Sequence, residues 1–255
     1  MGILSIGRRD VASPSAAAPV PGSPLPNVDP QAIVFSDVSL TWNGHEVLRG
    51  VDFGIDERRV GILGQNGCGK STLLRLMIGL IAPSHGKITV SGLDPRRDAA
   101  GVRDRTGFLF QTPDNQIVYP IVQEDLAFGL KARGLSKEMA AARIEASLAR
   151  LGIAHLAARR CHELSGGERQ LVALAGVLTR APRTILFDEP TSQLDLANRN
   201  RFRRLLARMS EQAIVVTHDL ELIDDFDRVL VIDAGRVIVD ATPAEAIARY
   251  RDLCR

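Results

Sequence analysis

A glycine-rich stretch combines the residue types that proteins use to hold phosphate. It reads GQNGCGKST over residues 64–72, and it meets the spacing G-x-x-x-x-G-K-[ST] between an apolar run and a helical pattern. Glycines let successive backbone N–H groups turn toward a phosphate, and the following helix adds its positive N-terminal end. We expect Lys70 to reach the outer phosphates and the Ser71 hydroxyl to bind Mg²⁺. The predicted binding residues of this loop are Gly64, Asn66, Gly67, Cys68, Gly69, Lys70, Ser71 and Thr72.

A second stretch, TILFDEP, is an apolar run that ends in two carboxylates, Asp188 and Glu189. Burying two adjacent acids without a cation is costly, so positive charge is expected beside them. We expect Asp188 to hold the Mg²⁺ shell and Glu189 to orient or deprotonate an attacking water. The alternative is structural, with one acid capping a helix and the other on the surface before Pro190.

A third stretch, LSGGERQ, places Ser165, Gly166 and Gly167 before a helix that begins near Glu168. This predicts a second helix terminus able to bind an anion in the same chain. A single nucleotide cannot occupy both sites. A simple Ser/Gly helix cap would explain this segment alone, but not the presence of the other two motifs.

Regular elements must position these motifs, and from Ile33 the chain alternates strand-like runs with helical periods. The strand-like runs are IVFSDVSL, VGILG, KITVSG, GFLF, TILFD, AIVVTH, RVLVID and RVIVD. The helical periods cover residues 71–80, 137–151, 167–179 and 197–209. Runs rich in Ile, Val and Leu predict an α/β fold with a mostly parallel sheet covered on both faces.

Two segments depart from that alternation. Residues 112–162 are dominated by helical patterns, which predicts a helical lobe inserted into the α/β domain. Residues 1–30 combine proline, alanine and serine with few large apolar side chains, which predicts a disordered arm before a domain over residues 31–255.

Composition narrows the function classes. The net charge is +2 over 32 basic and 30 acidic side chains, so charge gives no indication of nucleic-acid binding. The three cysteines show no disulfide or zinc-ligand spacing, which is typical of a reducing compartment. The longest apolar run, residues 171–178, is far shorter than the roughly 20 residues that cross a bilayer. Any membrane role must therefore come through a partner.

Taken together, the three motifs and several flanking residues resemble the ATP-binding-cassette (ABC) ATPases over about residues 33–245. The resemblance implies a P-loop fold with an antiparallel β subdomain, a helical subdomain over about residues 112–165 and a short C-terminal helix at about 242–254. It also implies that ATP is bound with Mg²⁺. The flanking residues with implied roles are Trp42 against adenine, Gln111 on Mg²⁺ and water, Asp195 between subunits and His218 on the γ-phosphate. For Trp42 a place in the core is the alternative, and for His218 a structural role.

In this family two subunits enclose ATP head to tail. Lys70 of one copy would then face the Ser165–Glu168 segment of the other, and Asp195 would tie the copies together. Because every motif is intact, the resemblance implies a homodimer with two competent sites in which Lys70, Glu189 and His218 are catalytic.

A narrower likeness rests on FQTPDNQI, EDLAFG, ELSGGERQLVALAGVL and DFDRVLVID. These segments resemble the energy-coupling ATPases of micronutrient importers, which implies a transmembrane subunit docked on the helical lobe and a separate membrane protein that binds the cargo. The implied location is the cytoplasmic side of the inner membrane, and the expected cargo is cobalt, with biotin, another vitamin or nickel as the alternative. Two further hypotheses are a soluble ABC protein and a nucleotide-binding assembly protein without turnover.

Cys68 departs from the family, which has a small hydroxyl residue at this position. It lies at a helix N-terminus near Lys70, conditions that lower a thiol pKa. We expect alkylation of Cys68 to inactivate the enzyme and ATP to protect it.

Overall fold

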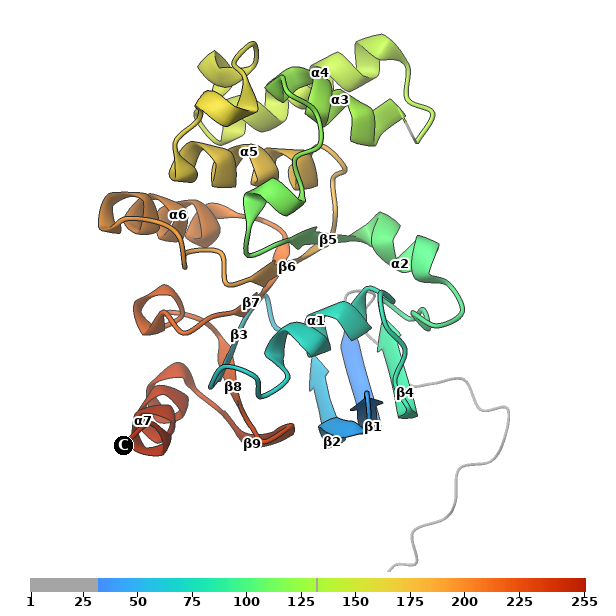
Figure 1. The fold of residues 1–255 in the computed structure, drawn as a ribbon, viewed down its shortest axis with the longest axis vertical. Helices are drawn as coiled ribbons and strands as arrows, with labels where there is room; N and C mark the ends of the chain where they lie inside the picture. The colour runs from blue at the N-terminus through green and yellow to red at the C-terminus, as the bar shows by residue number, and fades with distance from the viewer. Residues whose placement is uncertain (1–31, 132) are drawn as a thin grey trace, which may run out of the picture.

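The structure is a computed structural model that describes residues 32–131 and 133–255. The arm predicted over residues 1–30 lies outside these described residues. Two sheets and a group of helices make up the described chain, with the antiparallel sheet at one end and the helical lobe at the other (Figure 1).

The larger sheet has six strands in the order β5-β6-β7-β3-β8-β9. All neighbours are parallel except β8 and β9, which confirms the mostly parallel sheet. Its strands are β3 (Arg59–Gly64), β5 (Thr106–Leu109), β6 (Thr184–Asp188), β7 (Gln212–Val216), β8 (Arg228–Asp233) and β9 (Arg236–Ala241).

The smaller sheet is antiparallel, as the family resemblance implied, with the order β2-β1-β4. Its strands are β1 (Ile33–Trp42), β2 (His45–Ile55) and β4 (His85–Val90). Strand β2 is not among the predicted strand-like runs, because polar residues interrupt it. Its buried residues Val51, Phe53 and Ile55 alternate with exposed ones, and that period of two is the signal that predicts such a strand.

The four predicted helices are present as α1 (Lys70–Met77), α4 (Lys137–Arg150), α5 (Gly166–Leu178) and α6 (Leu196–Arg208). Only α1 ends distinctly earlier than expected, because Gly79 adopts the left-handed conformation (φ 63°) that commonly ends a helix. Three further helices were not among the four periods: α2 (Ala99–Arg105), α3 (Val122–Lys131) and α7 (Pro243–Leu253). Of these, α7 lies where the family resemblance implied a short C-terminal helix.

The lobe consists of α3, α4 and short 3₁₀ turns, and it packs on α5 (Figure 1). The 3₁₀ turns of the described chain are η1 (Pro113–Asn115), η2 (Ala154–Leu156), η3 (Cys161–Glu163) and η4 (Leu220–Leu222).

Side chains of the central strands alternate between two apolar clusters. On β6, Ile185 and Phe187 join the cluster formed with the lobe, α5 and α6. Leu186 points to the other face, where Leu73, Leu74 and other residues of α1 pack together with the antiparallel sheet. Both faces of the sheet are therefore covered, and the buried face of α1 fixes the loop that precedes it.

Candidate functional site

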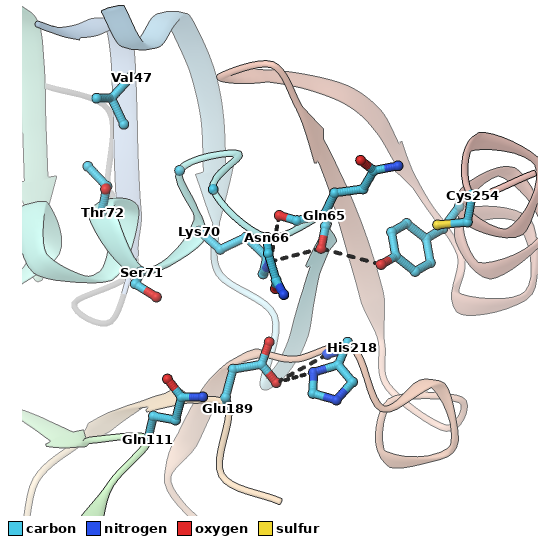
Figure 2. Close-up of a pocket in the computed structure, with 14 residues that line it drawn as sticks. Val47, Gln65, Asn66, Lys70, Ser71, Thr72, Gln111, Glu189, His218 and Cys254 are labelled. Atoms are coloured by element: carbon cyan, nitrogen blue, oxygen red, sulfur yellow. Dashed lines mark hydrogen bonds and ion pairs between the residues drawn. The ribbon is translucent and has the colours of Figure 1, made fainter. Parts of the chain in front are cut away.

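A cavity of about 580 Å³ lies where β3, β6 and β7 end. Because the carboxyl ends of neighbouring parallel strands meet at one edge of a sheet, the loops that follow them gather there. Figure 2 shows the phosphate loop on one side and Gln111, Glu189 and His218 on the other. The cavity is lined by Val47, Gly64, Gln65, Asn66, Gly67, Gly69, Lys70, Ser71, Thr72, Gln111, Glu189, His218, Tyr250 and Cys254.

Two glycines of the loop are required by close approach and backbone conformation. A Cβ on Gly64 would lie 2.4 Å from the carbonyl oxygen of Ile232 on β8, so only glycine fits against that strand. Gly69 precedes α1 in the left-handed conformation, with φ 107°, which glycine adopts without strain.

Lys70 folds back onto the loop that carries it. Its Nζ donates to the carbonyl oxygens of Gly64 at 2.8 Å and Gln65 at 3.0 Å. The side chain is buried, so its positive charge is held at the wall of the cavity. A phosphate entering the cavity would compete with these two carbonyls for the ammonium group.

Ser71 lines the cavity and contacts Asp188, which is buried behind it and is not among the lining residues. The Ser71 hydroxyl donates to Asp188 Oδ1 at 2.8 Å. Burial raises the pKa of the Asp188 carboxyl, while the hydrogen bond from Ser71 and the charges of Arg75 and Lys70 oppose that shift. A buried carboxylate beside a hydroxyl oxygen is a donor pair that suits a hard cation such as Mg²⁺.

Glu189 and His218 form an ion-pair geometry at the cavity wall. Glu189 Oε2 lies 2.8 Å from His218 Nδ1 and accepts a 3.3 Å hydrogen bond from the His218 backbone N–H (Figure 2). Glu189 has φ 49°, an uncommon conformation for a residue with a side chain. It is buried, as is Asp188, so neither is the surface acid that the structural alternative required.

Trp42 lies elsewhere. It ends β1 with 56% of its surface exposed, and it does not line the cavity. The alternative of a core residue is therefore wrong for Trp42. The Trp42 indole is therefore accessible at the surface, but it does not lie in the cavity that contains the phosphate loop.

The Ser165–Glu168 segment also lies outside the cavity. Ser165 caps α5 by accepting from the Glu168 backbone N–H at 3.3 Å, and Glu168 Oε2 accepts in return from the Ser165 backbone N–H at 2.8 Å. The Ser165 hydroxyl also donates to Glu168 Oε2, at 2.7 Å, and the two hydrogen bonds from Ser165 to that carboxylate hold the pKa of Glu168 below its usual range. The helix cap is therefore real, but Ser165 and Gly166 remain exposed.

Asp195 is similarly engaged within its own chain. It caps α6 by accepting from the Asn198 backbone N–H at 2.8 Å, and it is exposed. Neither Asp195 nor the Ser165–Glu168 segment meets Lys70 within one chain.

The lowered pKa that the sequence predicted for the Cys68 thiol is contradicted by the structure. The side chain is buried, and it packs beneath the loop in the cluster formed by α1 and the antiparallel sheet. Burial raises the pKa of the Cys68 thiol, although the charge of Lys70 and a backbone hydrogen bond oppose the shift. Alone among the predicted loop residues, Cys68 does not line the cavity.

Sequence reasoning missed Tyr250 of α7 and Cys254, the residue that directly follows α7, both of which line the cavity. The buried Ala246 and the half-buried Ile247 and Tyr250 follow a helical period, which marks one face of α7 as packed. That period carries no information about which surface the face covers.

A glycine-rich loop between β3 and α1, a hydrogen bond from Ser71 to the buried Asp188, and a buried Glu189 directly after β6 define a P-loop nucleotide-binding protein. A family model described as ABC transporter matches residues 48–192, more than half of the chain.

Relatives agree with this match. The biotin transport ATP-binding protein BioM of Rhizobium etli is 49% identical over 221 residues, covering 87% of this chain and 98% of that protein. The cobalt import ATP-binding protein CbiO of Syntrophus aciditrophicus is 41% identical over 203 residues, covering 77% and 72%. A solved structure, cbiO1 from Clostridium perfringens, part of the ABC transporter complex cbiONQ, has a TM-score of 0.78 at 31% identity, covering 87% of this chain and 92% of that chain.

The chain therefore belongs to the ABC transporter family and is an ABC-type ATPase. It resembles the energy-coupling type of these ATPases. No helix within residues 32–131 and 133–255 combines the length and apolar character needed to cross a bilayer.

Proposed function

We propose that this chain is the energy-coupling ATPase of a micronutrient importer, and that it hydrolyses ATP at the seam of a head-to-tail homodimer. One observation carries the proposal. The phosphate loop and Glu189 line one cavity, with Asp188 hydrogen-bonded to Ser71 of the loop, while Ser165 and Gly166 are exposed outside that cavity on the same chain. A second copy can supply that segment.

ATP would enter beside the phosphate loop. The backbone N–H groups of the loop and the N-terminus of α1 favour phosphate, and Lys70 would leave the two carbonyls for the outer phosphates. Mg²⁺ would be held by Ser71, Asp188 and Gln111, and it would neutralise the phosphate charge. Trp42 would stack on the adenine.

Glu189 would direct the attacking water. It is buried at the cavity wall, where a carboxylate orients or deprotonates water, and His218 holds one of its oxygens. With a γ-phosphate bound, His218 would contact that phosphate as well as the Glu189 carboxylate.

The second copy would complete each site. Ser165 and Gly166 are exposed at the start of α5, at the positive end of its dipole, which suits a γ-phosphate held by the partner's loop. Asp195 is exposed at the start of α6 and would join the copies. The dimer would close when ATP binds and reopen after hydrolysis, and this motion would drive the membrane subunits of the transporter.

The helical lobe would receive the transmembrane subunit. A largely apolar groove of about 910 Å³ runs between α3 and α4, and Phe128 on its wall is 49% exposed. Lys131 and Glu124 border the apolar wall with opposite charges. The related cbiO1 is part of a complex, and a separate membrane protein would bind the cargo. The chain would then sit on the cytoplasmic side of the inner membrane, without a nucleic-acid partner.

Cobalt and biotin are the two cargoes to test. BioM at 49% identity and CbiO at 41% make biotin at least as well supported as the cobalt expected from the sequence. The whole transporter, purified with its membrane subunits and placed in vesicles, should take up either radiolabelled cobalt or radiolabelled biotin with ATP. Uptake of neither would contradict both of these cargo assignments.

Glu189→Gln tests the catalytic assignment. The amide keeps the shape of the side chain but cannot accept a proton, so we expect ATP turnover to fall by about 10²–10⁴-fold while ATP remains bound. Phosphate release and retained ATP are measured on the same preparation. Glu145→Gln, an exposed change on α4, is the matched control and should turn over at the wild-type rate. A wild-type rate in Glu189→Gln would refute the role of Glu189.

A further inference from the structure

Gln111 is carried by an irregular segment that follows β5. The strand ends at Leu109, and Gln111 lines the nucleotide cavity two residues later. The chain then forms the 3₁₀ turn η1, and Figure 1 shows this green segment passing between β5 and α5. Because the strand has ended, the backbone of the segment needs partners other than a neighbouring strand. The position of Gln111 therefore depends on how the segment is anchored.

The Gln116 side chain provides two anchors. Its Oε1 accepts a hydrogen bond from the Phe110 backbone N–H at 3.4 Å, and its Nε2 donates to the carbonyl oxygen of Ala173 on α5 at 2.9 Å. The first contact closes the loop around Gln111, since Phe110 directly precedes Gln111 and Gln116 follows it. The second contact attaches the closed loop to α5.

A carboxamide suits this pair of partners. It carries one acceptor oxygen and one donor NH₂ group, while Phe110 offers a donor and the Ala173 carbonyl offers an acceptor. The opposite orientation of the amide would satisfy neither partner, so the two contacts together fix the side chain. A carboxylate at this position could not donate to Ala173, and an apolar side chain could serve neither group.

An ion pair adds a weaker contact between η1 and α5. Asp114 Oδ1 lies 3.6 Å from Arg169 Nη1, and the Asp114 side chain is 63% exposed. Exposed ion pairs contribute little to stability, because water screens them. Gln116 is half-buried, and its partner Ala173 is buried. The amide of Gln116 is therefore the stronger of the two attachments.

We propose that Gln116 is a positioning residue, which holds Gln111 at the nucleotide cavity by closing its loop and anchoring that loop to α5. Gln116 does not itself line the cavity, so it acts through Gln111. The inference rests on the proposed function, in which Gln111 contacts Mg²⁺. It is independent of the cargo and of the membrane partner.

Gln116→Met tests the anchor in the chain without nucleotide, because it keeps the length of the side chain and removes both hydrogen-bonding atoms. Hydrogen exchange at the Phe110 amide, followed by mass spectrometry of peptides within residues 106–117, should become about 2- to 12-fold faster, as expected for one net hydrogen bond. Gln123→Met, exposed on α3, is the matched control and should leave this exchange unchanged. Faster exchange throughout the chain would show a general structural role and would overturn the inference.

A double-mutant cycle tests whether Gln116 acts through Gln111. Gln116→Met should lower ATP turnover with Mg²⁺ roughly 10-fold, because a small displacement of a catalytic group is costly. ATP affinity without Mg²⁺ should stay at the wild-type value, since the phosphate loop is not changed. In a Gln111→Ala background, Gln116→Met should cause no further loss of turnover. Wild-type turnover in Gln116→Met, or the same fold loss in both backgrounds, would overturn the inference.

The two measurements separate this inference from the proposed function. Wild-type turnover in Gln111→Ala alone would refute the Mg²⁺ role of Gln111, which belongs to the proposed function. Hydrogen exchange is measured without Mg²⁺ or ATP, so it decides the anchor by itself. Unchanged exchange at Phe110 in Gln116→Met would overturn the anchor whatever the result with ATP.

Discussion

The three thiols of the chain differ in how far burial suppresses their ionisation. Cys68 and Cys161 are buried, and burial raises the pKa of each, whereas Cys254 is exposed at the cavity. Because the thiolate is the nucleophile, a raised pKa lowers the reactive fraction at neutral pH. We expect N-ethylmaleimide to modify Cys254 first, with Cys68 as slow as Cys161, in a time course followed by peptide mass spectrometry.

Cys161 is the matched control, since it is buried away from the phosphate loop. Protection by ATP is expected at Cys254, which lines the cavity, and not at Cys68. Modification of Cys68 as fast as that of Cys254 would show that Lys70 outweighs burial and would restore the reactive thiol predicted from sequence.

At the scale of elements, Arg59 joins the strand that carries the phosphate loop to the end of α6. Its guanidinium is buried and donates to the carbonyl oxygens of Leu206 and Met209 at 2.6 Å each and of Glu211 at 2.9 Å. Hydrogen bonds to charged groups are strong, so Arg59→Ala should lower the free energy of unfolding by roughly 2–3 kcal/mol, measured by urea denaturation. Arg204→Ala, exposed on the same helix, should change it little, and equal values for the two variants would contradict this role.

The local sequence pattern predicted most of the helices and strands, but it did not predict which of them contact one another. The loop motif and the strand before it lie within a few residues, so spacing alone predicted the strand, turn and helix around Lys70. Strand β2 was missed, although the alternation of the apolar residues Val51, Phe53 and Ile55 with polar residues or glycine is a signal for it. The position of Tyr250 depends on how α7 docks, and the direction of the Cys68 side chain depends on packing beneath the loop. Neither is encoded by neighbouring residues.

At the scale of the molecule, the site is divided between two surfaces of one chain. The phosphate loop, Gln111, Glu189 and His218 line one cavity, and Ser165 is exposed outside it at the start of α5. Head-to-tail pairing of two copies would bring these surfaces together, so that Ser165 of one copy contacts the γ-phosphate bound by the other. Ser165→Arg should therefore leave ATP binding to the single chain intact but prevent pairing, because the long side chain would fill the space needed by the partner's phosphates.

The mass of the Glu189→Gln variant in solution with Mg²⁺ and ATP tests the central claim most directly. Light scattering should give twice the 27.7 kDa of one chain with Mg²⁺ and ATP, and a single-chain mass for the same variant carrying Ser165→Arg. A mass of 27.7 kDa for ATP-loaded Glu189→Gln would contradict the shared site, as would a dimer that Ser165→Arg leaves unchanged.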